Sequence, residues 1–193
     1  FDWFVASIYL VFQGNKEQAL KLLTNISHLT ISKFLWPVYS LMVVEPVASE
    51  ISVLYSTTAH YVDFLLQTEL PLVAAAFTMS GFSSIQVCQQ WLQQCFWNYL
   101  DWSDIVHYIC TCCVLGADYQ IYLCIAILHY LQTDILSQAQ QQTLLIFLKE
   151  EPIRGFHICH YLNFMKKLEV TYRDLLLSEM CDKRTNSKKN DIK

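Results

Sequence analysis

The stretch from Trp91 to Leu136 constrains the fold more than any other part of the chain. It contains two apolar helix-forming segments joined at Leu115-Gly116-Ala117, preceded by an aromatic helix. In the second segment, Tyr119–Leu136, apolar residues recur at offsets of three and four, and most positions between them are apolar as well. A helix that is apolar around its whole circumference must be covered by neighbouring elements. We therefore expect this segment to be the central helix of an all-α domain.

The composition indicates one domain with unusually few charges. The chain has 193 residues, of which 54% are hydrophobic and 16% are charged, against about 25% charged in a typical globular protein. No linker rich in proline, glycine or serine divides it. We expect a helical domain over residues 1–180 and a flexible basic tail over residues 181–193. The shortage of charge indicates either an apolar face that meets a partner or a piece of a larger polypeptide whose other parts cover it.

Charge and hydropathy exclude several classes of protein. The formal net charge is -4 and the body has no basic stripe, whereas binding to phosphate backbones needs clustered lysine and arginine, so we expect no nucleic acid partner. Residues 70–100 carry no charge, but glutamine and asparagine interrupt them repeatedly. We expect an amphipathic helix there and no transmembrane segment. No cleavable signal peptide is recognisable at the N-terminus.

Capping and breaking residues give the limits of the other expected helices. Asn15 is placed to cap a helix, Pro46 fits the first turn of a long one, and Ser83-Ser84 caps another. The first segment begins without a recognisable N-cap, and Asp101 or Ser103 caps the helix that ends at Leu115. The expected helices outside the central pair cover residues 1–12, 16–27, 31–39, 46–68, 72–79, 84–100, 137–149 and 155–180.

The cysteines and histidines are the residues of this chain that most often bind metal ions. Cys110-Thr111-Cys112-Cys113 has no second CxxC pair to complete four tetrahedral ligands, so we expect these cysteines to pack in the core of a protein in a reducing compartment. His157 and His160 share one helix face with Cys159 nearby, but no carboxylate partner is identifiable by spacing, and an exposed helix start is the favoured interpretation. Isolated His107 and His129 are expected to form hydrogen bonds within the core. No metal site is predicted.

No enzyme motif accompanies these residues. The sequence has no nucleophile elbow, Walker loop, HExxH or GxGxxG, and its four glycines leave little material for a phosphate-binding loop. We therefore expect no cofactor and no catalytic residue in this chain.

The order of several weak motifs resembles the C-terminal part of the TBC domain, the all-helical fold of Rab GTPase-activating proteins. Trp91 and Phe96 stand at the spacing of that family's W-x-x-x-x-F helix, and a helix with a glycine turn follows, then an apolar helix and a Leu-x-x-x-Pro break. The match covers roughly residues 1–180. The residues that stand for it, called the family-pattern residues below, are Trp91, Phe96, Gly116, Tyr122 and Pro152.

The resemblance implies a mechanism whose residues are missing here. TBC proteins use an arginine from I-x-x-D-x-x-R and a glutamine from Y-x-Q-G to stabilise the transferring phosphoryl group and orient water. The first motif does not occur, and Phe12-Gln13-Gly14 is interpreted as a helix terminus, since both catalytic positions would lie upstream of Phe1. Ile109-Cys110 also replaces the family's Trp-Asp pair.

Three hypotheses follow. Within the family the sequence resembles a ciliary member that acts with a cell-cycle-related kinase in Hedgehog signalling. We therefore expect a catalytically inactive interaction module in the cytoplasm, cilium or basal body, whose partner is such a kinase or a small Rab-type GTPase. The alternative is a Rab GTPase-activating protein whose Arg and Gln fingers lie upstream. A helical-repeat scaffold is the third hypothesis, but no repeating two-helix unit is found.

Overall fold

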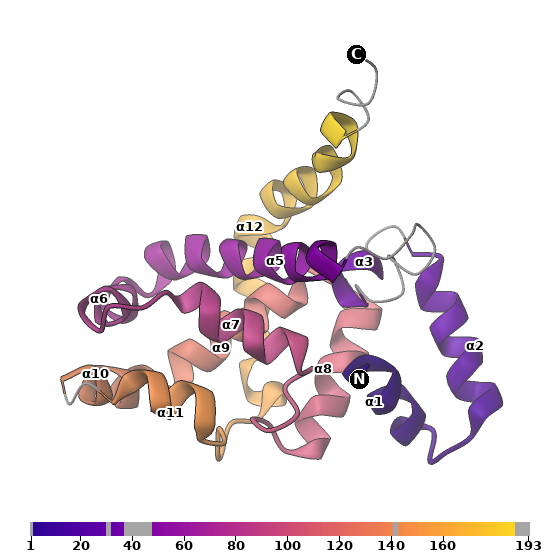
Figure 1. Ribbon diagram of the computed structural model, residues 1–193, viewed down its shortest axis with the longest axis horizontal. Helices are drawn as coiled ribbons and strands as arrows, with labels where there is room; N and C mark the ends of the chain where they lie inside the picture. The colour runs from indigo at the N-terminus through magenta and orange to yellow at the C-terminus, as the bar shows by residue number, and fades with distance from the viewer. Residues whose placement is uncertain (1, 30–31, 37–47, 141–142, 188–193) are drawn as a thin grey trace.

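All the secondary structure that the computed structural model describes is helical (Figure 1). The described residues are 2–29, 32–36, 48–140 and 143–187. The all-α fold class predicted from the sequence is thus confirmed. The helices are α1 (Trp3–Val11), α2 (Lys16–Ser27), α3 (Ser32–Leu35), α5 (Ala48–Glu69), α6 (Pro71–Met79), α7 (Ser84–Gln93), α8 (Trp102–Leu115), α9 (Tyr119–Tyr130), α10 (Gln132–Gln140), α11 (Leu144–Glu150) and α12 (Ile158–Ser187).

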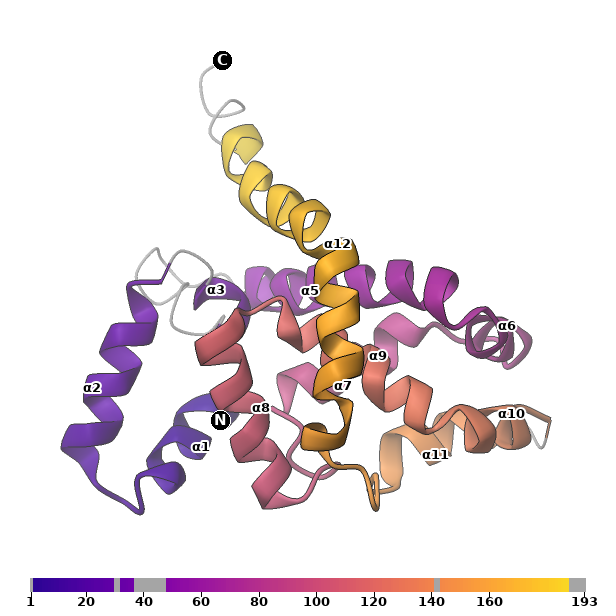
Figure 2. The ribbon, with the colours of Figure 1, turned by 180° about the vertical axis from the view of Figure 1, so that it is seen from behind.

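Helix α9 lies at the centre of the domain. Every residue from Tyr119 to Leu128 is buried. Helix α5 packs across it on one side and α12 on the other, as the two opposite views show (Figures 1 and 2). The expectation of a central helix covered on all sides is confirmed.

The central helix is shorter than predicted. It ends at Tyr130 instead of Leu136, because the chain turns at Leu131 and α10 begins at Gln132, packing against α6 and α11. Exposed polar residues, Thr133 and Asp134, follow this turn at the surface. The helix expected over residues 137–149 is accordingly two helices, α10 and α11.

Helix α7 is also shorter than predicted. It starts after the Ser83 cap, as expected, but ends at Gln93 and not at Leu100. Cys95 and Phe96 follow with φ angles of 50° and 57°, so the backbone there is left-handed and cannot continue a helix. The predicted W-x-x-x-x-F helix therefore carries Trp91 only.

Several local signals fix the remaining helix ends. The Asn15 side chain accepts a hydrogen bond from the Gln18 amide, as expected of an N-cap. The first helix does have an N-cap, contrary to our expectation, because Asp2 accepts a hydrogen bond from the Val5 amide. Pro71 stands in the first turn of α6. Pro46 and Pro37 lie outside the described residues.

Helix α12 runs seven residues past its expected end and reaches Ser187. The boundary predicted at residue 181 therefore lies inside a helix, while flexibility of the last residues stays a prediction. The N-terminal part of α12 packs against α8 and α9, and its C-terminal part projects beyond α5 (Figure 2).

Within the described ranges, no single helix combines the length and apolar composition needed to cross a membrane. The stretch Leu54–Glu69 together with α6 meets that test by length and composition, but the two helices are bent by 115° relative to one another.

Candidate functional site

The Trp91–Phe96 pair forms the end of α7. The Phe96 amide donates to the Trp91 carbonyl at 2.9 Å, and the Cys95 amide donates to the Leu92 carbonyl at 3.0 Å. These are the two bonds of a Schellman motif, in which an apolar contact joins the third-last helical residue to the second residue beyond the cap. The two rings supply that contact, with centroids 6.4 Å apart. The five-residue spacing thus encodes a helix stop.

Trp91 also holds the Pro152 break in place. Its indole nitrogen donates to the Leu148 carbonyl at 3.1 Å, and the Tyr99 hydroxyl donates to the Lys149 carbonyl at 2.9 Å. The Ile153 amide, directly after Pro152, donates to the Tyr99 carbonyl at 2.8 Å. Trp91 and Pro152 line one cavity of about 460 Å³. Three of the family-pattern residues therefore belong to one packed corner of the domain.

Gly116 and Tyr122, the other two, lie at a second place, beside an ion pair whose carboxylate is buried. The Asp118 carboxylate is fully buried, and its Oδ2 lies 3.5 Å from Nε of Arg173 on α12. Gly116 has a φ of 129°, and a Cβ there would meet both Asp118 and the Arg173 guanidinium. The Arg173 guanidinium also donates to the Leu115 carbonyl. Glycine is required because the ion pair occupies the space of its side chain.

The neighbours of Asp118 compensate its buried charge only in part. Burial raises the pKa of the Asp118 carboxyl, while the Arg173 guanidinium and the Tyr122 hydroxyl lower it in part. Arg173 also pairs with Glu169, whose other oxygen accepts a hydrogen bond from the Tyr119 hydroxyl at 2.6 Å. The cluster joins the α8–α9 turn to α12. The charged and hydroxyl groups of this cluster bind one another and so stabilise the fold.

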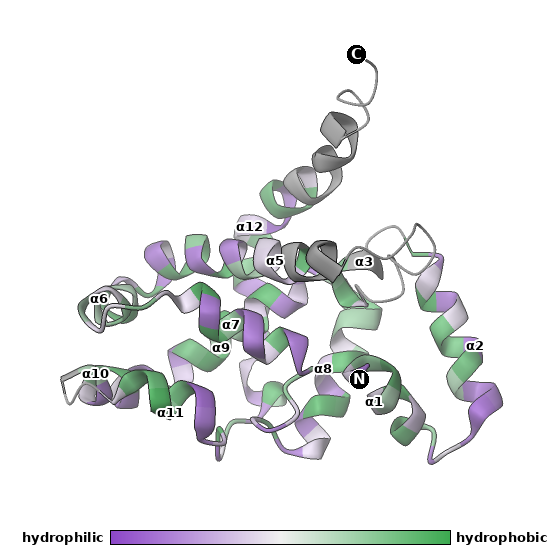
Figure 3. Ribbon diagram, viewed as in Figure 1, coloured by the Kyte–Doolittle hydropathy of each residue, from purple (hydrophilic) through white to green (hydrophobic). Residues whose placement is uncertain are grey.

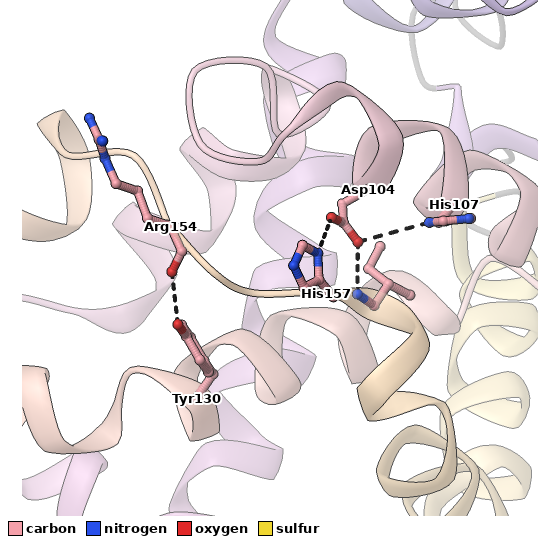
Figure 4. Close-up of polar contacts among 6 residues, drawn as sticks. Asp104, His107, Tyr130, Arg154 and His157 are labelled. Carbon is pink, nitrogen blue, oxygen red and sulfur yellow. Dashed lines mark hydrogen bonds and ion pairs between the residues drawn. The ribbon is translucent and has the colours of Figure 1, made fainter.

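A second buried carboxylate, Asp104, holds the N-terminus of α12 (Figure 4). Its Oδ1 accepts a hydrogen bond from the Ile158 amide at 2.8 Å, and its Oδ2 lies 3.1 Å from Nδ1 of His157. His107 Nδ1 is 3.9 Å from Oδ1. This is the carboxylate partner that sequence spacing did not reveal for the histidines near the start of α12. Its one local signal is an aspartate in the first turn of an otherwise apolar helix.

The expectation that His107 and His129 lie in the core is wrong. The His107 side chain is 56% exposed. His129 is exposed on the last turn of α9, with its ring 4.8 Å from that of Phe164. Both residues occupy positions where their helices face outward, so no internal partner is needed.

The cysteines behave mainly as small core residues. Cys88, Cys95, Cys112 and Cys124 are buried free thiols, and burial raises the pKa of Cys95 to about 12. Cys110, expected in the core, is exposed, because α8 turns that position outward. Over the described ranges, no group of three or more His, Cys, Asp or Glu side chains could enclose a metal ion.

The residues nearest to catalytic fingers have other roles. Gln13 is an exposed residue with a φ of 52° at the end of α1, which agrees with the predicted helix terminus. Arg173 is committed to its ion pairs, and the exposed Arg154 offers its backbone carbonyl to the Tyr130 hydroxyl at 2.8 Å.

An apolar groove lies between α1 and α2. It has a volume of about 580 Å³, and Tyr9 and Leu20 on its walls are 40% and 66% exposed. Helix α1 is hydrophobic along most of its length (Figure 3). Its buried residues are Phe4, Ser7 and Ile8. A helix of that composition normally needs more cover. The groove therefore leaves apolar surface available for contact.

These features define an all-helical domain of the TBC type. The family model described as the broad-minded protein Rab TBC domain matches residues 1–183, and the chain belongs to this family. It is 49% identical to Protein broad-minded of Danio rerio and 47% identical to that of Mus musculus, over 183 residues in each case. The alignment covers 93% of this chain but 14% of each relative. No solved structure matches the chain.

Proposed function

We propose that this chain is a catalytically inactive TBC-type interaction module of a longer protein that is needed for primary cilium assembly and Hedgehog signalling. It acts in the cytoplasm, at the cilium or basal body. Its partner is a cell-cycle-related kinase or a small Rab-type GTPase. The proposal rests on the family to which the chain belongs and on the chemistry of its side chains.

The proposed lack of catalysis is supported mainly by the contacts of Arg173 within the fold. A GTPase-activating arginine must reach the transferring phosphoryl group of another protein. Arg173 instead neutralises buried Asp118 and binds the Leu115 carbonyl. Withdrawing it would leave a buried carboxylate without compensation, at a cost of several kcal/mol. Arg173 therefore stabilises the fold and is not available as a finger.

The apolar groove between α1 and α2 supports a protein contact. Leu20 is largely exposed on its wall, and exposed apolar side chains are what a binding interface covers. Exposed Gln18 lies on the same helix, outside the groove lining. Leu20→Glu therefore adds a negative charge inside the groove, and Gln18→Glu adds the same charge outside it as a matched control.

Rescue of cilium formation tests the proposal. Cells that lack the endogenous protein receive the full-length protein with Leu20→Glu or Gln18→Glu, and the fraction of ciliated cells and a Hedgehog reporter are measured. We expect Leu20→Glu to lose rescue while Gln18→Glu keeps it, at equal protein levels. Full rescue by Leu20→Glu would show that the groove is not required, and full rescue by the core-disrupting Leu123→Asp would show that the module is not required.

The alternative function is that of a Rab GTPase-activating protein whose fingers lie outside this chain. Two findings support this alternative. The family model is described as a Rab TBC domain, and this chain covers only 14% of each relative, so fingers could lie in the remaining part. It predicts accelerated GTP hydrolysis by the full-length protein and loss of ciliary rescue when the upstream fingers are replaced.

A further inference from the structure

We propose that His157 and His160 form an open binding site for a borderline divalent cation such as Zn²⁺, with Asp104 orienting the His157 ring. This site is independent of the interaction function proposed above. It uses the histidine motif at the start of α12, which that function does not explain.

The His157 ring is held as metal-binding histidines usually are. Its Nδ1 lies 3.1 Å from the Asp104 carboxylate, which accepts hydrogen bonds only, so Nδ1 carries the proton. The Nε2 atom is then left as the lone-pair donor, on a side chain that is 46% exposed. Histidine ligands commonly donate their second N–H to a carboxylate in this way, which fixes the tautomer and the ring plane.

Asp104 is itself rigidly placed. Its side chain is 2% exposed, and its other oxygen accepts the Ile158 amide at 2.8 Å. The carboxylate therefore cannot rotate away without breaking the N-terminal anchor of α12. Figure 4 shows His157 and His107 on either side of Asp104, with the Arg154 guanidinium turned away from them.

His160 stands at the right separation to share an ion with His157. The ring centroids are 5.5 Å apart and the ring planes are nearly perpendicular, at 87°. With Zn–N bonds of about 2.0–2.1 Å, two imidazoles on one tetrahedral ion have centroids roughly 5 Å apart. Both side chains are exposed, so small shifts of the rings bring both nitrogens to one ion.

The local charge also favours a cation. The N-terminus of a helix carries about half a positive charge, which by itself would repel one. The Asp104 carboxylate lies at the same point, 3.1 Å from Nδ1 of His157 and 3.9 Å from Nδ1 of His107. A carboxylate there offsets the positive helix end beside His157, one of the two proposed ligands.

Two protein ligands leave the other coordination positions open to water or to a donor from a partner protein. No third histidine, cysteine or carboxylate completes an enclosing set within the part of the chain that the structure describes. Binding is therefore weaker and more reversible than at a structural site with four protein ligands.

Zinc titration of the 193-residue chain by calorimetry at neutral pH tests the site. We expect saturable binding that is lost in His157→Ala and in His160→Ala. Asp104→Asn should weaken it by about 10–100-fold, as expected when an orienting partner is removed. His129→Ala and Cys159→Ser, which alter an exposed histidine elsewhere and the neighbouring thiol, should bind as the parent does.

A second readout separates this site from binding elsewhere and from misfolding. In ¹⁵N spectra of the histidine rings, the Nε2 signals of His157 and His160 should move on addition of Zn²⁺, while His129 stays unchanged. Circular dichroism checks that each variant is folded. Saturable binding that survives the His157→Ala/His160→Ala double variant, loss of binding in Cys159→Ser, or no saturable binding by the parent would overturn the proposal.

Discussion

The backbone amide of Phe96 donates a hydrogen bond to the carbonyl of Trp91, 2.9 Å away, and their rings pack with centroids 6.4 Å apart. The pair ends α7 and fills the core below it, since both side chains are fully buried. The W-x-x-x-x-F pattern, which we expected to lie within one helix, thus marks the end of a helix. The chain leaves α7 at this point and begins α8 at Trp102.

Replacing Phe96 by alanine should remove the apolar contact between the Trp91 and Phe96 rings. Truncation of a fully buried aromatic side chain costs about 3–5 kcal/mol of unfolding free energy. Urea denaturation followed by circular dichroism measures the loss. Asn98→Ala, an exposed change two residues further on, should stay within about 0.5 kcal/mol of the parent. Equal effects of the two changes would contradict the role assigned to Phe96.

The Asp118–Arg173 ion pair should appear as energetic coupling. Arg173→Met leaves a buried carboxylate uncompensated and should cost about 3 kcal/mol or more. In the Asp118→Asn background the same change should cost at least about 1 kcal/mol less, because the buried charge is gone. Some cost remains, since Arg173 also binds Glu169 and the Leu115 carbonyl. A double-mutant cycle with no coupling would show that the two side chains act independently.

Gly116 should tolerate no side chain, and Gly81 provides the matched comparison. Both have positive φ angles, 129° and 75°, so alanine strains the backbone at each, by on the order of 1 kcal/mol. At Gly116 the new Cβ would also lie 2.8 Å from an Arg173 nitrogen, whereas at Gly81 it meets nothing within 4 Å. We expect Gly116→Ala to cost at least twice as much unfolding free energy as Gly81→Ala. Similar costs would mean that the Asp118 and Arg173 side chains move away from the new Cβ at little cost in free energy.

Stability should depend on pH through Asp118. Burial raises the pKa of this carboxyl in the folded state above its ordinary value of 3.8, so the folded protein binds the proton more tightly than the unfolded chain does. The contribution of this group to stability therefore falls as pH rises from 3.8 through the folded pKa. Unfolding free energies measured across this range should decline for the parent relative to Asp118→Asn. A parent that gains stability relative to the variant over the same range would reverse the sign and contradict the account.

Local signals in the sequence predicted where two of the helices start. Asn15 and Ser83 cap helices through their own side chains, so each of these signals lies at the place that it marks. Helix ends were harder to predict. The residue after the α7 cap is Cys95 in a left-handed conformation that usually selects glycine or asparagine, and no breaker residue marks the turn at Leu131.

The polar clusters were beyond prediction because they join distant parts of the chain. Asp104 meets the Ile158 amide 54 residues away, and Arg173 meets the Leu115 carbonyl 58 residues away. Both contacts form because α8 and α12 run side by side in the same direction. One contact lies at the start of α8 and the other at its end. Helical periodicity shows which residues share a face of one helix, but it does not pair one helix with another.

The central claim, that this module does not catalyse GTP hydrolysis, is tested most directly by single-turnover assays. Each member of a panel of Rab proteins is loaded with GTP and mixed with the full-length protein, with an Arg154→Ala variant in parallel. We predict no acceleration with any Rab, and identical rates for the parent and the variant. Acceleration on the order of 10³-fold or more with any Rab would fit a finger mechanism and contradict the account.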